Sequence, residues 1–225
     1  MSMPTLTELM EVGAHFGHKK EKSCPRAKVF TYIIRDSVYV INLEKTLEQL
    51  KTAIAYLKKA VEEDKVVLFV GTKQQAKEPV RKLAESFKMP FMVKHWPAGL
   101  LTNFATIKRS LKTLADLENT IKSPEFAQLT KKERKVVEEK KEKLYQIFEG
   151  IKDLKNMPDA LFAVDTVKEK VAVSEARKMS IPIVGVCDTN ANPDLIDIPI
   201  PANDDSAKTI VLLLKNIEEG IREQK

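Results

Sequence analysis

Two histidines near the N-terminus, His15 and His18, stand three residues apart and could bind one metal ion. Asp188, Asp204 and Asp205 lie at a strand end or a helix start, on the edge where the histidines are expected to arrive. Imidazole and carboxylate ligands suit zinc or a harder divalent ion such as magnesium. These five residues are a predicted site for a structural ion, although the sequence requires no cofactor. The alternative is that the histidines bond to backbone groups and the acids cap the last helix.

Basic side chains gather in two places. The segment 15–28 has one acid, Glu21, and five basic residues: Lys19, Lys20, Lys22, Arg26 and Lys28. The segment 104–113 has Lys108, Arg109 and Lys112 with no acid, and Trp96 precedes it on a loop that contains proline and glycine. Lysine and arginine neutralise phosphates, and loops can follow an irregular RNA surface. Both clusters favour nucleic acid over charge that only keeps the protein soluble.

Evidence for an enzyme is weak. Gly71-Thr72-Lys73 follows an apolar run and resembles a phosphate loop, but that loop needs several glycines and the chain has only seven. Cys24 and Cys187 have no neighbouring base, so neither is a convincing nucleophile. We therefore predict a protein without catalytic residues or a small-molecule substrate. The alternative is an α/β enzyme or sensor that binds a nucleotide at the strand ends.

Composition excludes further classes. No stretch approaches 18 uncharged apolar residues, which argues against a membrane span. Two cysteines cannot form a disulfide framework, and we expect a cytoplasmic protein with reduced thiols. The net charge of +6 hints at a polyanionic partner that meets a local patch.

Strand and helix patterns alternate along most of the chain. Continuous apolar runs predict buried strands, with further short strands, at 29–34, 38–41, 66–70, 91–93, 160–164, 181–187 and 196–200. Amphipathic spacing predicts helices at 43–61, capped by Asn42, and at 73–87, 168–179 and 204–221. The alternation indicates a doubly wound parallel α/β sheet with three layers and about five strands.

Residues 102–150 lack any strand pattern. They carry only narrow apolar seams among charged residues, which predicts an inserted antiparallel coiled-coil hairpin of two helices. The charges of 131–143 have both signs and are expected to form a solvated face. The predicted domains are an α/β sheet domain, 1–101 with 151–225, and the hairpin insertion, 102–150.

Several segments in order resemble the bacterial small-subunit ribosomal protein family S2. The similar segments are Val12–His18, Leu68–Lys73, Leu101–Phe104, Gly150–Asp153, Pro158–Phe162, Asp188–Asn190, Asn192–Leu195 and Pro199–Asp205. The resemblance implies a flavodoxin-like sheet with a protruding coiled coil. It also implies a non-enzymatic, ribosome-bound protein that binds small-subunit ribosomal RNA and contacts neighbouring proteins. Among these is the large protein that captures messenger RNA, which the family helps to dock.

The predicted RNA contacts combine the basic clusters with positions in the similar segments. They are Lys19, Lys20, Lys22, Arg26, Lys28, Lys73, Trp96, Asn103, Lys108, Arg109 and Lys112. The chain departs from the usual family pattern at His95, Pro97, Ala98 and Ala202. The first three predict a stiffer loop with less fixed charge, and Ala202 would be strained if its φ were positive.

Overall fold

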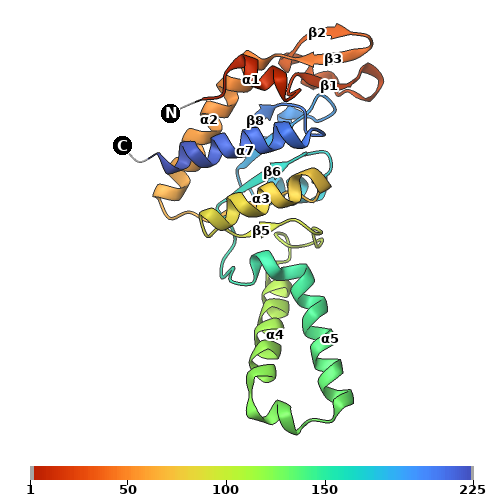
Figure 1. The fold of residues 1–225 in the computed structure, drawn as a ribbon, viewed down its shortest axis with the longest axis vertical. Helices are drawn as coiled ribbons and strands as arrows, with labels where there is room; N and C mark the ends of the chain where they lie inside the picture. The colour runs from red at the N-terminus through yellow and green to blue at the C-terminus, as the bar shows by residue number, and fades with distance from the viewer. Residues whose placement is uncertain (1–2, 224–225) are drawn as a thin grey trace.

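Five parallel strands form the centre of the computed structural model, which describes residues 3–223 (Figure 1). These strands are β4 (Val67–Val70), β5 (Phe91–Met92), β6 (Ala160–Val164), β7 (Ile183–Cys187) and β8 (Ile198–Pro201). Their order across the sheet is β5-β4-β6-β7-β8. This is 2-1-3-4-5 in chain order, the arrangement of flavodoxin-like sheets. The predicted parallel α/β fold is confirmed, and its strand order is consistent with a flavodoxin-like fold.

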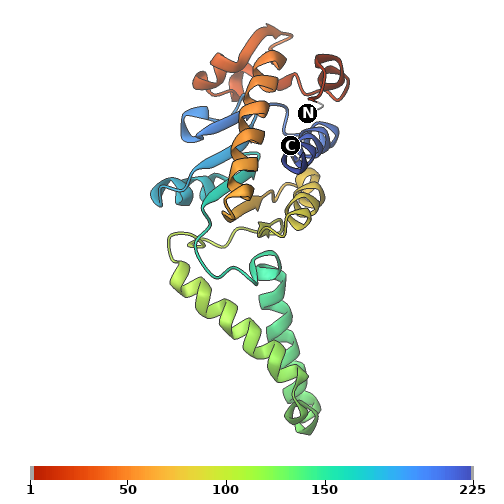
Figure 2. The ribbon, with the colours of Figure 1, turned by 90° about the vertical axis from the view of Figure 1, so that its left-hand side faces the viewer.

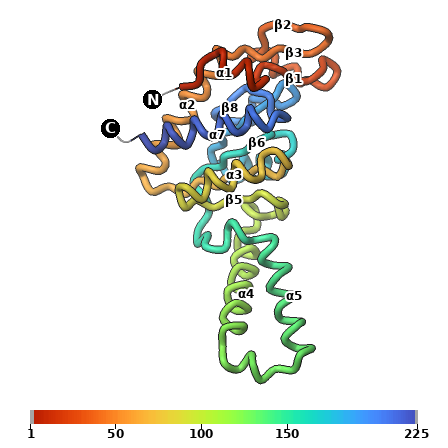
Figure 3. Tube along the Cα trace, viewed as in Figure 1, coloured from red at the N-terminus to blue at the C-terminus, as the bar shows by residue number. Residues whose placement is uncertain are grey.

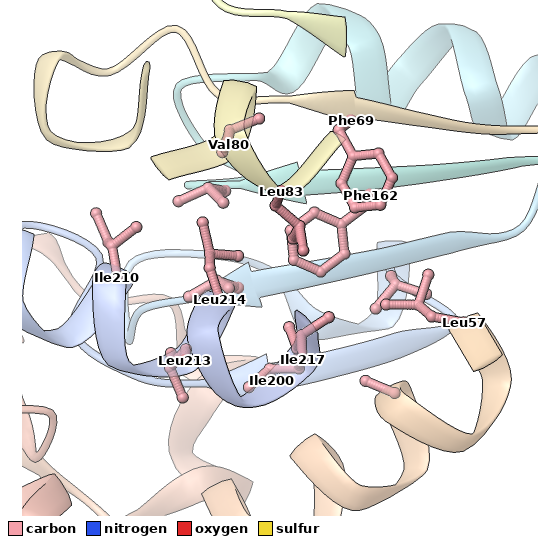
Figure 4. Packing of buried hydrophobic residues seen from close by; sticks show 14 of the residues in the cluster. Leu57, Phe69, Val80, Leu83, Phe162, Ile200, Ile210, Leu213, Leu214 and Ile217 are labelled. Carbon is pink, nitrogen blue, oxygen red and sulfur yellow. The ribbon is translucent and has the colours of Figure 1, made fainter. Parts of the chain in front are cut away.

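Three helices cover one face of this sheet (Figure 2). They are α2 (Leu43–Glu62), α3 (Gln74–Ser86) and α7 (Ala207–Arg222). Side chains alternate along the strands, so Phe69 and Phe162 point to these helices and pack at 5.3 Å between ring centroids (Figure 4). Leu57, Leu83 and Leu214, one from each of these helices, belong to the same buried cluster. This packing forms the larger of the two hydrophobic cores.

The other face carries a second core, built on the alternate residues of the same strands. Leu68, Leu161 and Ile183 pack there against α6 (Lys170–Lys178) and the loop that contains Trp96. The apolar stripes on both faces explain why the strand segments read as continuous hydrophobic runs.

Two long helices extend from the end of the sheet at which β5 lies (Figures 1 and 3). They are α4 (Phe104–Lys122) and α5 (Lys131–Phe148), with the 3₁₀ turn η3 (Pro124–Gln128) between them and η4 (Glu149–Ile151) after them. Their buried side chains are Ile107, Leu111, Leu114 and Phe148. These residues join the second core. Coiled-coil packing along the full length of the helices, and the division into two domains, stay predictions.

A small antiparallel sheet lies at the opposite end of the molecule (Figure 1). The chain runs through α1 (Leu6–Glu11), β1 (Phe16–Lys19), the 3₁₀ turns η1 (Lys20–Lys22) and η2 (Pro25–Phe30), β2 (Thr31–Arg35) and β3 (Val38–Ile41). The strand order is β1-β3-β2. Residues 15–28 carry few strand or helix signals in the sequence, yet β1, η1 and part of η2 lie in this segment. Strand β1 is stabilised by pairing with β3. Its sequence lacks a strand pattern because Gly17 and His18 interrupt the apolar and β-branched residues that are typical of strands.

The predicted helix ends differ in one informative place. Asn42 caps α2 as expected, with its side-chain oxygen accepting from the backbone N–H groups of Glu44 and Lys45. The last helix, however, begins at Ala207, and Ser206 caps it through the N–H of Thr209. Asp204 and Asp205, which precede this helix, therefore do not cap it. The short turn η5 (Pro193–Leu195) connects β7 to β8. Within residues 3–223 no helix has the length and apolar character to cross a membrane.

Candidate nucleic-acid interface

The five basic residues near the N-terminus are all exposed, and we call Lys19–Lys28 the N-terminal basic segment. Lys19 ends β1, and the other four lie in or beside the turns η1 and η2. Arg26 Nη1 lies 2.9 Å from Asp194 Oδ2, and both side chains are exposed. Within the described residues no carboxylate forms an ion pair with the four lysines: Lys19, Lys20, Lys22 and Lys28. Their charge is therefore available to a phosphate.

Helix α4 presents a second set of exposed basic residues: Lys108, Arg109 and Lys112. In the part of the chain that the structure describes, these three also have no carboxylate partner. Lys108 Nζ lies 5.9 Å from the ring centroid of Phe104, one turn earlier. Asn103 is exposed at the start of the helix, where its Oδ1 accepts from Thr106 Oγ1. The N-terminal basic segment and α4 lie toward opposite ends of the long axis (Figure 1).

Lys73, which was predicted to contact RNA, lies among three carboxylates. Its Nζ is 3.0 Å from Asp165 Oδ2, 2.7 Å from Asp204 Oδ1 and 2.6 Å from Asp205 Oδ1. Lys73 follows β4 and Asp165 follows β6, so this ion pair occupies the edge where the strand order reverses. Open α/β sheets bind ligands at that point. Here the chain's own side chains fill it, and we call these four residues the Lys73 cluster.

Burial and charge perturb the acids of the Lys73 cluster. Burial and the neighbouring Asp165 raise the pKa of Asp204 to about 7, against the opposing effect of Lys73. The hydrogen bond from Lys73 lowers the pKa of the more exposed Asp205. Burial alone would lower the pKa of the Lys73 ammonium, but its carboxylate partners raise it above the ordinary value. Lys73 therefore stays charged, and its charge is neutralised inside the fold.

His18 lies at the rim of the Lys73 cluster, beside Asp188. Its Nδ1 is 3.1 Å from Asp188 Oδ2, and its Nε2 is 3.6 Å from Asp205 Oδ2 and 3.3 Å from Asn190 Nδ2. The neighbouring carboxylate of Asp188 raises the pKa of His18. The structure thus brings together four of the five residues predicted to bind a metal: His18, Asp188, Asp204 and Asp205.

His15 is not part of that group. Its ring lies 4.0 Å from that of Phe16, and burial lowers the pKa of its imidazole. Among residues 3–223 no group of three or more histidines, cysteines or acids is arranged to hold a metal ion. The ammonium of Lys73 supplies positive charge among the carboxylates instead. The metal site stays a prediction, which elemental analysis of the purified protein would test.

Trp96, another predicted RNA contact, is only 6% exposed and belongs to the second core. Its indole Nε1 donates to Glu175 Oε1 at 3.1 Å. The same carboxylate accepts from the backbone N–H groups of Gly99, Leu101 and Thr102 and from the Thr102 hydroxyl. Although burial opposes it, these donors lower the pKa of Glu175. In this structure the Trp96 ring supports the loop before α4 and is not available to a base.

Three acids in this region were not predicted, and each is tied to a loop. Asp165 completes the Lys73 cluster, and its end-of-strand position was the signal that could have identified it. Glu169 is buried and accepts from the N–H and hydroxyl of Thr72. These bonds fix the position of Thr72, which directly precedes Lys73. In the sequence, Glu175 looks like an ordinary acid on the surface of a helix. Nothing in the sequence pattern predicts that five hydrogen-bond donors bind its carboxylate. Among the departures from the family pattern, Ala202 does not have positive φ and is not strained there.

Comparisons with known proteins give the family to which the chain is similar. The model of the family described as Ribosomal protein S2 matches residues 9–224. The small ribosomal subunit protein uS2 of Coprothermobacter proteolyticus is 44% identical over 99% of this chain and 83% of that protein. The uS2 proteins of Helicobacter hepaticus and Helicobacter acinonychis are each 42% identical over 98% of this chain, and over 84% and 90% of their own lengths.

Proposed function

The chain belongs to the ribosomal protein S2 family, and we propose that it binds small-subunit ribosomal RNA through the N-terminal basic segment and α4. The family is a structural, non-enzymatic component of the small ribosomal subunit. The proposal depends on one observation: the basic side chains of these regions are exposed, and most of them have no acidic partner among the described residues. Eight lysines and arginines of these two regions were predicted to contact RNA, and in the described residues seven of them have no acidic partner: Lys19, Lys20, Lys22, Lys28, Lys108, Arg109 and Lys112.

Unpaired, exposed basic residues are suited to phosphate binding. A phosphate contact neutralises a lysine and releases a counterion from the RNA, which favours binding most strongly at low salt. An internal carboxylate would compete with the phosphate for the same lysine. The two basic regions lie toward opposite ends of the long axis, so the proposed RNA contact has two parts (Figure 2). The rigid parallel sheet between them would fix their spacing.

The proposed partners include neighbouring small-subunit proteins, among them the large protein that captures messenger RNA. Helix α5 supports a protein contact because its charges are mixed and it exposes apolar side chains. Val136 is 59% exposed and Ile147 is 39% exposed. Deleting 119–131 is expected to weaken docking of that protein while leaving RNA binding intact. Unchanged docking in small subunits purified with the deletion variant would refute a contact at the tip.

The RNA proposal is tested by removing charge from one region at a time. In the first variant Lys19, Lys20, Lys22 and Arg26 become alanine. In the matched control the same number of charges is removed from α5, by changing Lys131, Lys132, Lys135 and Lys140 to alanine. Binding to a small-subunit ribosomal RNA transcript is measured between 50 and 200 mM salt, and incorporation into subunits is followed by sedimentation.

We expect the first variant to bind RNA weakly and to lower the slope of log K against log salt by about 3. Each lost phosphate contact removes roughly 0.7–0.9 from that slope. The control should keep the wild-type slope, because acids offset the charge of α5. Wild-type incorporation and slope in the first variant would overturn the assignment of the N-terminal basic segment.

A further inference from the structure

Helix α6 packs on the second face of the parallel sheet, and the two acids of its segment are buried. Glu169, directly before the helix, accepts from Thr72, and Glu175 accepts from the loop before α4. The charged side chains that remain exposed between residues 166 and 180 are all basic, and we call the surface that they form the α6 face: Lys168, Lys170, Arg177 and Lys178. A segment whose charges are mixed in the sequence is therefore uniformly basic on the outside of the fold.

The lysines of the α6 face are not neutralised within the fold. Among residues 3–223 no carboxylate forms an ion pair with Lys168, Lys170 or Lys178. Arg177 has a partner, since its Nη1 lies 3.5 Å from Asp197 Oδ1, and both of these side chains are about half exposed. Lys170 and Arg177 are seven residues apart and share one side of the helix, and Lys170 and Lys178 are separated by about 12 Å along its axis. The α6 face is long enough for different phosphates to bind at its two ends.

At one end the α6 face adjoins the N-terminal basic segment through the turn η5. Arg26 Nη1 lies 2.9 Å from Oδ2 of Asp194 in this turn. Thr166, in the turn before α6, and Ile196, directly after η5, both pack against Gly185. A Cβ on Gly185 would lie 2.7 Å from Thr166 Cγ2 and 3.4 Å from Ile196 Cγ2. The start of the α6 segment and the turn η5 therefore lie side by side.

At its other end the α6 face adjoins the start of α4. The carboxylate of Glu175 accepts from the backbone N–H of Thr102 at 3.1 Å, two residues before α4 begins. Along the long axis of the molecule, α6 lies between the small N-terminal sheet and α4 (Figure 2). A third basic surface thus lies between the two that were assigned to RNA.

Resting on the proposed function, we infer that the α6 face binds phosphates of paired small-subunit ribosomal RNA, between the N-terminal basic segment and α4. Its lysines are exposed and each can neutralise a phosphate. Unpaired bases are recognised by stacking on aromatic side chains, and residues 166–180 contain no aromatic residue. A paired helix presents its phosphate backbone instead, which basic side chains bind without reading the bases.

Charge and side-chain size favour RNA over a protein as the occupant. The large apolar side chains exposed on this segment are Val167, Val171 and Met179. Protein interfaces are usually anchored by aromatic or arginine side chains that fill a pocket of the partner, and the arginine here already has Asp197 beside it. A protein would also have to supply several carboxylates to this face, whereas an RNA strand carries one phosphate for every nucleotide.

The first test removes charge from the α6 face alone. In the α6 variant Lys168, Lys170 and Lys178 become alanine. The matched control changes to alanine one exposed lysine on each of α2, α3 and α7, the helices on the opposite face of the sheet: Lys51, Lys82 and Lys208. Binding to the small-subunit ribosomal RNA transcript is measured across the same salt range as before, and thermal unfolding shows whether each variant is folded.

We expect the α6 variant to lower the slope of log K against log salt by about 2, because each lost phosphate contact removes roughly 0.7–0.9. The control should keep the wild-type slope. A wild-type slope in the α6 variant, together with a lowered slope in the four-alanine variant of the N-terminal basic segment, would mean that the inference is wrong and the proposed function stands. Absence of salt-dependent RNA binding by the wild-type protein would overturn both.

A crosslink identifies the occupant without removing any charge. Ser174 is exposed on α6, one turn from Lys170, and Ser174→p-benzoylphenylalanine is incorporated into small subunits and irradiated. Ala55→p-benzoylphenylalanine, at an exposed position of α2, is the control. A crosslink from position 174 to a paired RNA segment, with none from position 55 to the same segment, supports the inference. A crosslink only to protein or to unpaired RNA, or none, overturns it.

Discussion

The Lys73 cluster and the N-terminal basic segment hold positive charge in opposite ways. Lys73 Nζ lies within 3.0 Å of an oxygen on each of three aspartates, and its side chain is 15% exposed. The lysines at 19, 20, 22 and 28 are exposed and, among the described residues, have no carboxylate partner. The sequence places a basic residue in both regions, but only one of them offers charge to a polyanion.

This difference follows from solvation. A lysine removed from water needs partners that replace its hydration, and the aspartates of the Lys73 cluster supply them from two loops. An exposed lysine is already hydrated and needs no partner within the fold. Net charge alone therefore says little about where RNA binds, because buried and exposed charges count equally in the total of +6. Pairing within the fold distinguishes the two regions.

The largest expected effect comes from removing the buried charge. Lys73→Met leaves Asp165, Asp204 and Asp205 together without their cation, and we expect a loss of about 3–5 kcal/mol in the free energy of unfolding. Urea denaturation measures it. Changing Asp165 and Asp205 to asparagine in the Lys73→Met background should recover part of the loss, because it removes the repulsion.

The matched control for Lys73→Met is Lys22→Met in the N-terminal basic segment, which should change the free energy of unfolding by less than about 0.5 kcal/mol. Equal destabilisation by the two substitutions would contradict the difference between the enclosed Lys73 and the exposed lysines. It would mean that exposed lysines of the segment have structural partners, or that the aspartates of the Lys73 cluster are stable without Lys73.

The parallel sheet could be predicted from the sequence because burial on both faces leaves a local signal. The run 160–164 matches β6 residue for residue, and the runs at 66–70 and 181–187 contain β4 and β7. Strand β1 left no such signal. It has four residues, two of which are Gly17 and His18, and its partner β3 begins about twenty residues later.

The candidate site was predictable only in part. Parallel strands bring their carboxyl ends to one edge, and this rule correctly placed Asp188, Asp204 and Asp205 near His18. It could not show that Lys73 would lie among the acids, since a lysine after a strand is equally suited to phosphate. Nor could it show that Trp96 is buried, because its partner Glu175 lies on a helix far along the chain.

A smaller effect is expected at Glu175, where a buried negative charge is held by hydrogen bonds alone. Five donors from Trp96, Gly99, Leu101 and Thr102 bind its two oxygens. Glu175→Gln places an amide donor against backbone donors, and we expect a loss of about 2–3 kcal/mol. This substitution shows whether a buried charge needs an opposite charge, as Lys73 has, or only aligned hydrogen-bond donors.

The pH dependence of Glu175→Gln has a definite sign. The pKa of Glu175 is lower in the folded protein than in the unfolded chain, so its contribution is complete above the unfolded pKa and is lost as the pH falls through the folded pKa. The stability difference between wild type and variant should therefore shrink as the pH is lowered from 7 to below about 4. A difference that does not change with pH would contradict the hydrogen-bonded carboxylate.

The smallest effect on stability is expected at a single exposed lysine, where the functional effect is most specific. Lys20→Ala should leave the free energy of unfolding within about 0.5 kcal/mol of the wild type. If Lys20 binds one phosphate, the slope of log K against log salt for the ribosomal RNA transcript should fall by about 0.7–0.9. Lys132→Ala on α5 removes the same charge from an exposed helix and should leave that slope unchanged. A normal slope for Lys20→Ala would mean that an unpaired lysine in this segment does not by itself indicate a phosphate contact, and that the contrast with Lys73 concerns folding alone.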